Sequence, residues 1–369
     1  MKFSNFFDKK ICDYLIKQDH IVDLLQIQEL CIPKILKHGN TIVVSSTGSG
    51  KTLCFVLPTL VNLNNEINEP QVLVLLPTNE LSKQILSVYK HYATLFQNVT
   101  FYNAFNKHKS TKNINSKIIL SSPSEAIRLI KEGQLNINHL ETVILDEADM
   151  LYEFFHKEWK QLLIYLKQKK NLQYCLFSAT LHESLSNSIK KDINNAIIIK
   201  DKNDIWTNKN IKHYLIETNI LNNSQELKLK LLDKLLQMIH PFFCLIFVNN
   251  KKDAILVNEY LIKLRYKTAS LYSELDHKTR RDILLKANKL QYQILVCTDL
   301  AARGIDLNGV SDVISYDLPI DDLYYIHRAG RTGRGKYEGN SYVFNLSNNT
   351  NKIKKLKEKL DFKKIKLEI

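Results

Sequence analysis

The sequence predicts an α/β fold of two tandem domains, each a mainly parallel sheet flanked by helices. Short apolar runs recur along the chain, and each is followed by a polar loop and then a stretch with helical character. This alternation is typical of parallel sheets that are buried on both faces. It stops in a polar segment near residue 205 and then starts again. A chain of 369 residues is long enough for about two domains, each with its own core.

The predicted domains are residues 1–203 and 213–350, with a linker at 204–212 and a basic tail at 351–369. Residues 201–212 are polar and lack hydrophobic periodicity, which indicates a linker. The one candidate phosphate-binding loop of the sequence, residues 45–52, precedes this linker, so the second domain is expected to complete a site rather than to contain one of its own.

Composition and charge limit the possible classes of protein. The chain is 44% hydrophobic and 24% charged, which is ordinary for a globular protein. Its net charge is 52 − 38 = +14, which favours a polyanionic partner, although general lysine enrichment explains the charge equally well. The six cysteines are scattered and form no CxxC pair, which indicates buried thiols in a reducing compartment. No long apolar segment or signal-peptide core is present, so we expect a cytoplasmic protein, or a nuclear one if the organism has a nucleus.

Residues 1–40 are predicted to be helical, with Pro33 opening the last helix. Gln28 carries both a donor and an acceptor and can read the edge of an adenine, while an upstream aromatic such as Phe3 can stack on its face. The alternative for Gln28 is an ordinary surface position on a helix.

The stretch from Ser45 to Thr52 follows an apolar strand, residues 42–44, and precedes an apolar helix. This is the context of a P-loop, in which backbone N–H groups hold phosphates, Lys51 reaches the terminal phosphates and Thr52 offers a hydroxyl to Mg²⁺. Ser45 stands where the strict pattern has glycine, so an ordinary serine–glycine turn is the alternative. The predicted phosphate-binding residues are Ser46, Thr47, Gly48, Ser49, Gly50, Lys51 and Thr52.

Further apolar runs at 71–76, 117–120 and 142–145 predict buried strands that end in polar loops. The last run leads to Asp146 and Glu147. Asp146 is placed to bind the Mg²⁺ of a nucleotide, and Glu147 is the candidate base for the attacking water. An acidic pair after a strand is often only a solvated helix start, but the preceding P-loop favours the chemical role.

The strand predicted at 174–177 leads to Ser178 and Thr180, whose hydroxyls taken alone suit an ordinary helix cap. Strands are also predicted at 243–248, 294–297 and 313–316. Arg331 and Arg334 are predicted to lie three apart on one helical face, where guanidinium groups suit a transferring phosphoryl group. A basic helix that binds a phosphate backbone is the alternative.

Together these segments carry a family resemblance. Asp146-Glu147-Ala148-Asp149 reads DEAD, and residues 327–334 read HRAGRTGR. With the P-loop and Ser178-Ala179-Thr180, the chain resembles the DEAD-box ATP-dependent RNA helicases of superfamily 2 from about Phe3 to about Leu346.

The resemblance implies two tandem RecA-like domains with ATP and Mg²⁺ in the interdomain cleft. Hydrolysis there would drive local unwinding or remodelling of RNA duplexes or RNA–protein complexes. The alternatives are an ATP-gated RNA clamp with weak unwinding, a DNA helicase of the wider superfamily and a nonenzymatic RNA-binding protein.

The resemblance also implies residue roles. Ser178 and Thr180 would couple hydrolysis to strand separation, His327, Arg331 and Arg334 would act on the phosphates, and Asp306 would lie near the ribose. RNA contacts, mainly to the sugar–phosphate backbone, would come from Pro77, Thr78, Ser122, Pro123, Asn249, Arg280, Thr298, Arg303 and Gly304. A protein activator or another partner in an RNA–protein complex is also possible.

The chain departs from the family pattern at several positions. His20-Ile21 and Leu24-Leu25 replace the family's Gly-Phe and Pro-Thr before Gln28, which puts adenine selectivity in doubt. Asn79 replaces an arginine, Ser124-Glu125 replaces Gly-Arg, and paired glycines are absent near Asn103. These changes predict competent hydrolysis with an altered or weakened grip on RNA. The tail carries eight lysines against three acids, which suits either an RNA anchor or a final helix packed on the second domain.

Overall fold

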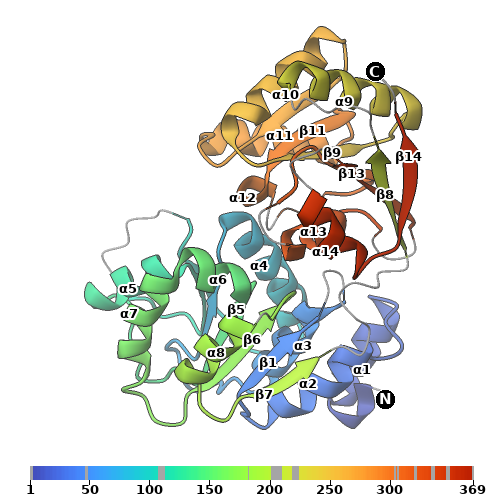
Figure 1. The fold of residues 1–369 in the computed structure, drawn as a ribbon. Coiled ribbons are helices and arrows are strands. Elements are labelled where there is room, and N and C mark those ends of the chain that lie inside the picture. Colours follow the sequence, from blue (N-terminus) through green and yellow to red (C-terminus); the bar gives the residue numbers. More distant parts are fainter. Residues whose placement is uncertain are drawn as a thin grey trace. The chain divides into compact units, whose positions relative to one another are not determined.

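The computed structural model describes residues 3–45, 49–106, 113–181, 183–200, 210–217, 224–302, 305, 307–319, 322–333, 337–345 and 350–367. It forms two compact units, Met1–Lys202 and Asn203–Ile369, each a parallel sheet with helices on both faces (Figure 1). The predicted α/β fold with two RecA-like domains is confirmed. Among the described residues, no helix is long and apolar enough to cross a membrane.

The first unit has a seven-stranded sheet in the order β3-β4-β2-β5-β6-β1-β7, with every pair parallel. Its strands are β1 Thr41–Val44, β2 Val72–Leu75, β3 Phe101–Asn103, β4 Ile118–Ser121, β5 Thr142–Asp146, β6 Gln173–Ser178 and β7 Ile197–Lys200. Its helices are η1 Phe3–Asn5, α1 Lys9–Lys17, α2 Gln26–Leu36, α3 Lys51–Val61, α4 Asn79–Ala93, α5 Pro123–Lys131, α6 Ala148–Phe154, α7 His156–Leu166 and α8 Glu183–Asp192.

Alternating side chains of the central strands divide the core of this unit between the two faces of the sheet. Val72 and Val74 pack with helices α1 to α4, while Leu73 and Leu75 pack with helices α5 to α8. Because both faces are covered, the central strands are apolar throughout, which is why continuous apolar runs predicted them.

The second unit has a seven-stranded parallel sheet in the order β10-β11-β9-β12-β13-β8-β14. Its strands are β8 Ile211–Glu217, β9 Cys244–Val248, β10 Thr268–Leu271, β11 Ile294–Thr298, β12 Asp312–Ser315, β13 Gly339–Asn345 and β14 Phe362–Lys366. Its helices are α9 Gln225–Ile239, α10 Lys251–Lys263, α11 His277–Asn288, α12 Asp299–Ala302, α13 Asp322–Ala329 and α14 Thr350–Lys357. Helices α9 and α10 pack on one face of this sheet, and α11 to α14 contribute to the cores on the other.

Two expectations from the sequence need correction. Pro33 lies inside α2 rather than at its start, because the buried residues Cys31, Ile32 and Ile35 continue the helix across it. The second unit already begins its sheet at Ile211, within the predicted linker, because this side chain is buried and its backbone pairs with Gly339. The remainder of that linker, residues 204–209, lies outside the described residues.

The predicted tail does not lie apart from the second domain, since α14 and β14 both belong to the folded second unit. Strand β14 pairs in parallel with β8, at the right of the second unit in Figure 1. The helix alternative for the tail is therefore present, together with an edge strand that its sequence did not predict.

Candidate nucleotide and nucleic-acid site

The phosphate-binding loop begins where β1 ends and closes where α3 begins. Gly50 precedes α3 with φ = +81°, in the left-handed region. A Cβ atom at Gly50 would lie 2.6 Å from Nε2 of Gln28, so the position requires glycine for its conformation and for its close packing. The Nζ atom of Lys51 donates a hydrogen bond to the backbone oxygen of Ser45, 2.5 Å away. Ser46, Thr47 and Gly48 lie outside the described residues.

Gln28 is buried and bound to the backbone at both ends of its amide. Its Oε1 accepts the N–H of Leu25 at 2.9 Å, and its Nε2 donates to the oxygen of Gly50 at 3.2 Å. Gln28 therefore ties the start of α2 to the end of the phosphate-binding loop, which rules out the surface alternative.

Phe3 lies in a different environment from the one predicted. Its ring is only 3% exposed and packs in the core with Phe7, at a centroid distance of 6.3 Å. The burial of this apolar ring leaves no open face to stack on a base.

The strands that carry the chemical residues are neighbours in the first sheet. Strand β6 pairs with β1 on one side and with β5 on the other. Val44 therefore lies opposite Ser178, and Asp146 lies opposite Phe177. Since parallel strands end at the same edge, the phosphate-binding loop, the segment from Ser178 to Thr180 and the DEAD segment meet there.

Asp146 and Glu147 differ sharply in environment. Asp146 is 6% exposed, and burial, with a smaller contribution from Glu147, raises the pKa of its carboxyl to about 7, against the opposing effect of Lys51. Glu147 has φ = +53°, and its N–H donates to Oδ1 of Asp146 at 3.1 Å. This sparsely populated backbone conformation turns the chain between the strand and α6.

Ser178 and Thr180 join the DEAD segment through a short chain of hydrogen bonds. The Oγ1 of Thr180 donates to Oδ2 of Asp149 at 2.8 Å, and the Oγ of Ser178 donates to the backbone oxygen of Thr180 at 2.6 Å. Both hydroxyls are buried, while Asp149 is partly exposed. Asp149 was not among the predicted site residues, although its place as the last acid of the DEAD tetrad was a signal for it.

In the second unit, the buried side chain of Arg328 holds three strand ends together. Its Nε and Nη2 donate to the carboxylate of Asp299 after β11, at 2.6 and 2.5 Å, and Nη2 also donates to Oδ1 of Asn249 after β9, at 3.1 Å. Its Nη1 donates to the backbone oxygen of Asp317 after β12. The sequence placed Arg328 in the motif but gave no sign of this role.

The arginine motif does not form one helical face as predicted. Helix α13 ends at Ala329, and the chain turns at Gly333, whose φ is +64°. Arg331 lies in this turn, where its Nη1 donates to the backbone oxygen of Ile305 at 2.9 Å. His327 lies in the last turn of α13. Arg334, Arg303, Gly304 and Asp306 lie outside the described residues.

Several predicted RNA-contacting residues follow strands and begin helices. Thr78 caps α4 by accepting the N–H of Leu81, and Ser122 caps α5 by accepting the N–H of Glu125, with Pro123 as the first helical residue. Pro77 directly follows Leu76 after β2, and Thr298 ends β11. Arg280 is 9% exposed and donates to the backbone oxygen of Ala301 at 2.9 Å, which fixes α11 against α12.

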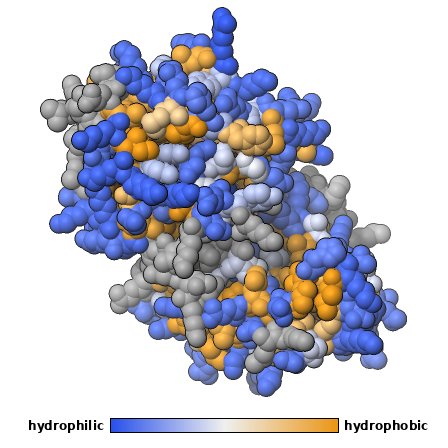
Figure 2. All heavy atoms as spheres, turned by 90° about the vertical axis from the view of Figure 1, so that its right-hand side faces the viewer, coloured by the Kyte–Doolittle hydropathy of each residue, from blue (hydrophilic) through white to orange (hydrophobic). Residues whose placement is uncertain are grey.

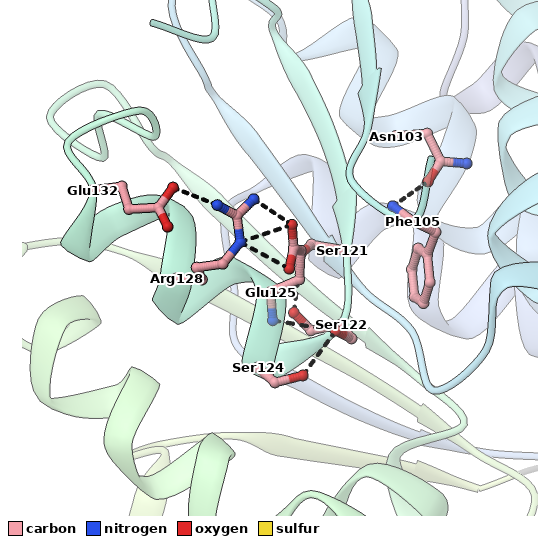
Figure 3. A network of polar contacts seen from close by, with 8 residues as sticks. All are labelled: Asn103, Phe105, Ser121, Ser122, Ser124, Glu125, Arg128 and Glu132. Carbon is pink, nitrogen blue, oxygen red and sulfur yellow. Dashed lines mark hydrogen bonds and ion pairs between the residues drawn. The ribbon is translucent and has the colours of Figure 1, made fainter. Parts of the chain in front are cut away.

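Figure 3 shows what replaces the family's basic position in the first unit. The carboxylate of Glu125 accepts from Arg128 through Nη2 at 2.6 Å and Nε at 3.1 Å, and Arg128 also pairs with Glu132. One positive charge therefore stands between two negative ones. Nearby, Oδ1 of Asn103 accepts the N–H of Phe105 at 3.1 Å, where the family has glycines.

A phosphate-binding loop at the carboxyl edge of a parallel sheet, beside a DEAD segment and followed by a second parallel-sheet unit, defines the class as a two-domain nucleoside triphosphatase. Residues 25–188 match the family described as DEAD/DEAH box helicase, and residues 227–336 match the helicase conserved C-terminal domain. The chain belongs to the DEAD-box ATP-dependent RNA helicases.

Relatives and solved structures agree with this assignment. The chain is 30% identical over 319 residues to the DEAD-box ATP-dependent RNA helicase CshB of Staphylococcus aureus, covering 85% of this chain and 70% of that protein. It is 33% identical over 345 residues to the probable ATP-dependent RNA helicase MG308 homolog of Mycoplasma pneumoniae, covering 93% and 79%. The structure of S. cerevisiae Dbp5 bound to RNA and ADP BeF3 is similar at a TM-score of 0.86 and 25% identity, covering 99% of this chain and 95% of that one.

Proposed function

We propose that this protein hydrolyses ATP and uses the reaction to unwind or remodel short RNA duplexes or RNA–protein complexes. The observation that supports this proposal best is that β1, β6 and β5 are adjacent strands and that Thr180 donates a hydrogen bond to Asp149. This arrangement joins phosphate binding, the coupling segment and the DEAD carboxylates at one edge of the sheet. The relatives named as ATP-dependent RNA helicases and the RNA-bound Dbp5 support RNA as the substrate.

Each of the predicted site residues has a separate role in the proposed reaction. Lys51 and the backbone N–H groups of its loop bind the phosphates. Glu147 orients the water and accepts its proton, while Arg331 and Arg334 stabilise the charge on the transferring phosphoryl group. Thr180 transmits the state of the DEAD segment to the rest of the first domain through Asp149.

Mg²⁺ fits the donor set at this edge, because a buried carboxylate and a hydroxyl are hard oxygen ligands. Thr52 and Asp146 would hold the ion on the nucleotide, where it would neutralise phosphate charge.

RNA is gripped through its backbone by the segments after the strands of each domain, among them Thr78, Ser122, Asn249 and Thr298. Hydroxyl and amide groups in such positions carry little information about the bases, so sequence specificity is weak. A protein activator is supported by the Dbp5 variant of S. cerevisiae solved bound to Gle1. A cytoplasmic location is supported by the six cysteines, which are all buried free thiols.

Separation of a short, fluorescently labelled RNA duplex tests this proposal. We expect strand separation with ATP and Mg²⁺, none without nucleotide, and little on a DNA duplex of the same sequence. Separation that is equally fast without ATP, or equally fast on DNA, would refute it.

A further inference from the structure

The last described segment of the chain is a folded, strongly basic surface. Residues 350–367 contain eight lysines and two acids, a net charge of 8 − 2 = +6. The apolar side of α14 is buried through Ile353 and Leu356, and Leu360 is buried just beyond the helix. The Phe362 ring of β14 packs against His213 and Tyr325. The lysines therefore project from fixed elements.

Three of the eight lysines are engaged with the second unit. The Nζ atom of Lys352 donates to the backbone oxygen of Pro319 at 3.2 Å, Lys359 pairs with Asp322 at 3.2 Å, and Lys364 pairs with Glu217 at 2.9 Å. The other five are exposed and form no ion pair with any described residue; they are Lys354, Lys355, Lys357, Lys363 and Lys366. Side chains alternate along a strand: Phe362 packs in the core on the α14 side of the sheet, and Ile365 packs in the core on the opposite side, so Lys363 points away from Lys366. We call the other four, which lie on the α14 side, the lysine face. Figure 2 views the side on which β14 lies, where hydrophilic residues cover much of the surface.

Protection of a sheet edge explains only part of this charge. Lysines on an edge strand discourage pairing with another chain, and β14 is an edge strand. That accounts for Lys363 and Lys366. It does not account for Lys354, Lys355 and Lys357, which lie on a helix.

The position of β14 relates the lysine face to the predicted RNA contacts. Strand β14 is parallel to the rest of its sheet, so it ends at the same edge as β9, which precedes Asn249. Four strand spacings separate β9 from β14 in the order β9-β12-β13-β8-β14, or about 19 Å at roughly 4.8 Å each. An RNA strand that leaves Asn249 along this edge reaches Lys366, at the end of β14 and the nearest member of the lysine face by this measure, within a few nucleotides.

We propose that the lysine face binds the sugar–phosphate backbone of single-stranded RNA next to the helicase site. The inference rests on the proposed function for its substrate. Lysine ammonium groups are compact point charges without the planar fork of arginine, so the face adds affinity rather than base selectivity.

The test compares two full-length triple variants. One carries Lys354→Gln, Lys355→Gln and Lys357→Gln. The control carries Lys263→Gln, Lys267→Gln and Lys289→Gln, which remove the same charge from exposed positions near the starts of β10 and β11. Binding of a labelled single-stranded oligoadenylate RNA is measured by fluorescence anisotropy over a salt series, and RNA-stimulated ATPase activity is measured in parallel.

The first variant is expected to bind about tenfold more weakly at low salt, with a slope of log K against log salt shallower by about 2, since each phosphate contact contributes about 0.7 for single strands. Its kcat at saturating RNA stays at the wild-type value, while half-maximal stimulation needs more RNA. The control variant is expected to bind like the wild type.

Unchanged affinity and slope in the first variant, or equal losses in both variants, would overturn the proposal. Competition by polyglutamate as strong as by RNA would also overturn it in favour of an acidic polypeptide. If the wild type shows no RNA-stimulated ATPase activity while the first variant still loses RNA affinity, the proposed function fails and the lysine face stands.

Discussion

Arg328→Met is expected to loosen the second domain severely. The guanidinium group of Arg328 is 1% exposed, and it satisfies Asp299, Asn249 and the backbone of Asp317 at once. Its charge also lies 5.3 Å from the ring centroid of Phe247. Methionine fills much of the same volume but donates no hydrogen bond.

The expected cost follows from this burial. Removing one partner of a buried ion pair costs about 3–5 kcal/mol, because the remaining charge and acceptors lose their compensation. At about 1.4 kcal/mol per factor of ten, local opening becomes roughly 10²–10⁴ times more frequent.

Hydrogen–deuterium exchange of the full-length protein measures this opening. Peptides that cover β9, β11 and β12 should lose protection by this factor, while peptides of the first unit should be unchanged. Arg281→Met is the matched control, because Arg281 is exposed on α11. A loss of protection below about fivefold in Arg328→Met, equivalent to about 1 kcal/mol, would refute the reasoning.

Three further predictions concern other residues. Burial lowers the pKa of His213, whose Nδ1 lies 2.8 Å from the hydroxyl of Tyr325, to about 4. The folded state is therefore fully stable with respect to this group above the ordinary pKa of about 6.5, and it loses up to about 3 kcal/mol as the pH falls from there towards 4. Urea titrations should show this loss, and His213→Phe should flatten it. Glu125→Arg removes a negative charge and adds a positive one, a net change of +2, where Arg128 now stands between two acids. It should lower the RNA concentration for half-maximal ATPase activity about three- to tenfold at low salt; no change relative to Glu66→Arg would contradict this. Gly50→Ala should weaken ATP binding and destabilise the first domain by more than the roughly 1–2 kcal/mol that a left-handed alanine costs, because the added Cβ meets Gln28 and Leu25. Gly133→Ala is the control for the conformational part of this free-energy cost, because Gly133 has φ = +69° and its Cβ would meet nothing within 4 Å.

The sequence predicted the strands that are buried on both faces of their sheet. Central strands such as β2 and β9 are buried throughout, and their uninterrupted apolar runs marked them. The edge strand β14 is partly exposed and reads Phe-Lys-Lys-Ile-Lys, so it had no clear apolar pattern. The edge strand β7 reads Ile-Ile-Ile-Lys, and this short apolar run was missed.

The site shows the same division. The place of Lys51, Asp146 and Glu147 at the edge of the first sheet could be predicted, because each belongs to a short motif that directly follows a buried strand. The locked amide of Gln28, the burial of Phe3 and the end of α13 at Ala329 could not, since each depends on packing between segments distant in the sequence. Arg328 illustrates the limit best, because a motif arginine reads the same whether it faces a phosphate or holds a domain together.

Steady-state ATP hydrolysis with and without single-stranded RNA tests the central claim most directly. The wild type should be strongly stimulated by RNA and little by DNA, Glu147→Gln should lose about 10²–10⁴-fold in kcat, and Glu66→Gln, a surface change in the same domain, should match the wild type. Hydrolysis that ignores RNA, or a Glu147→Gln variant as active as the wild type, would contradict the account.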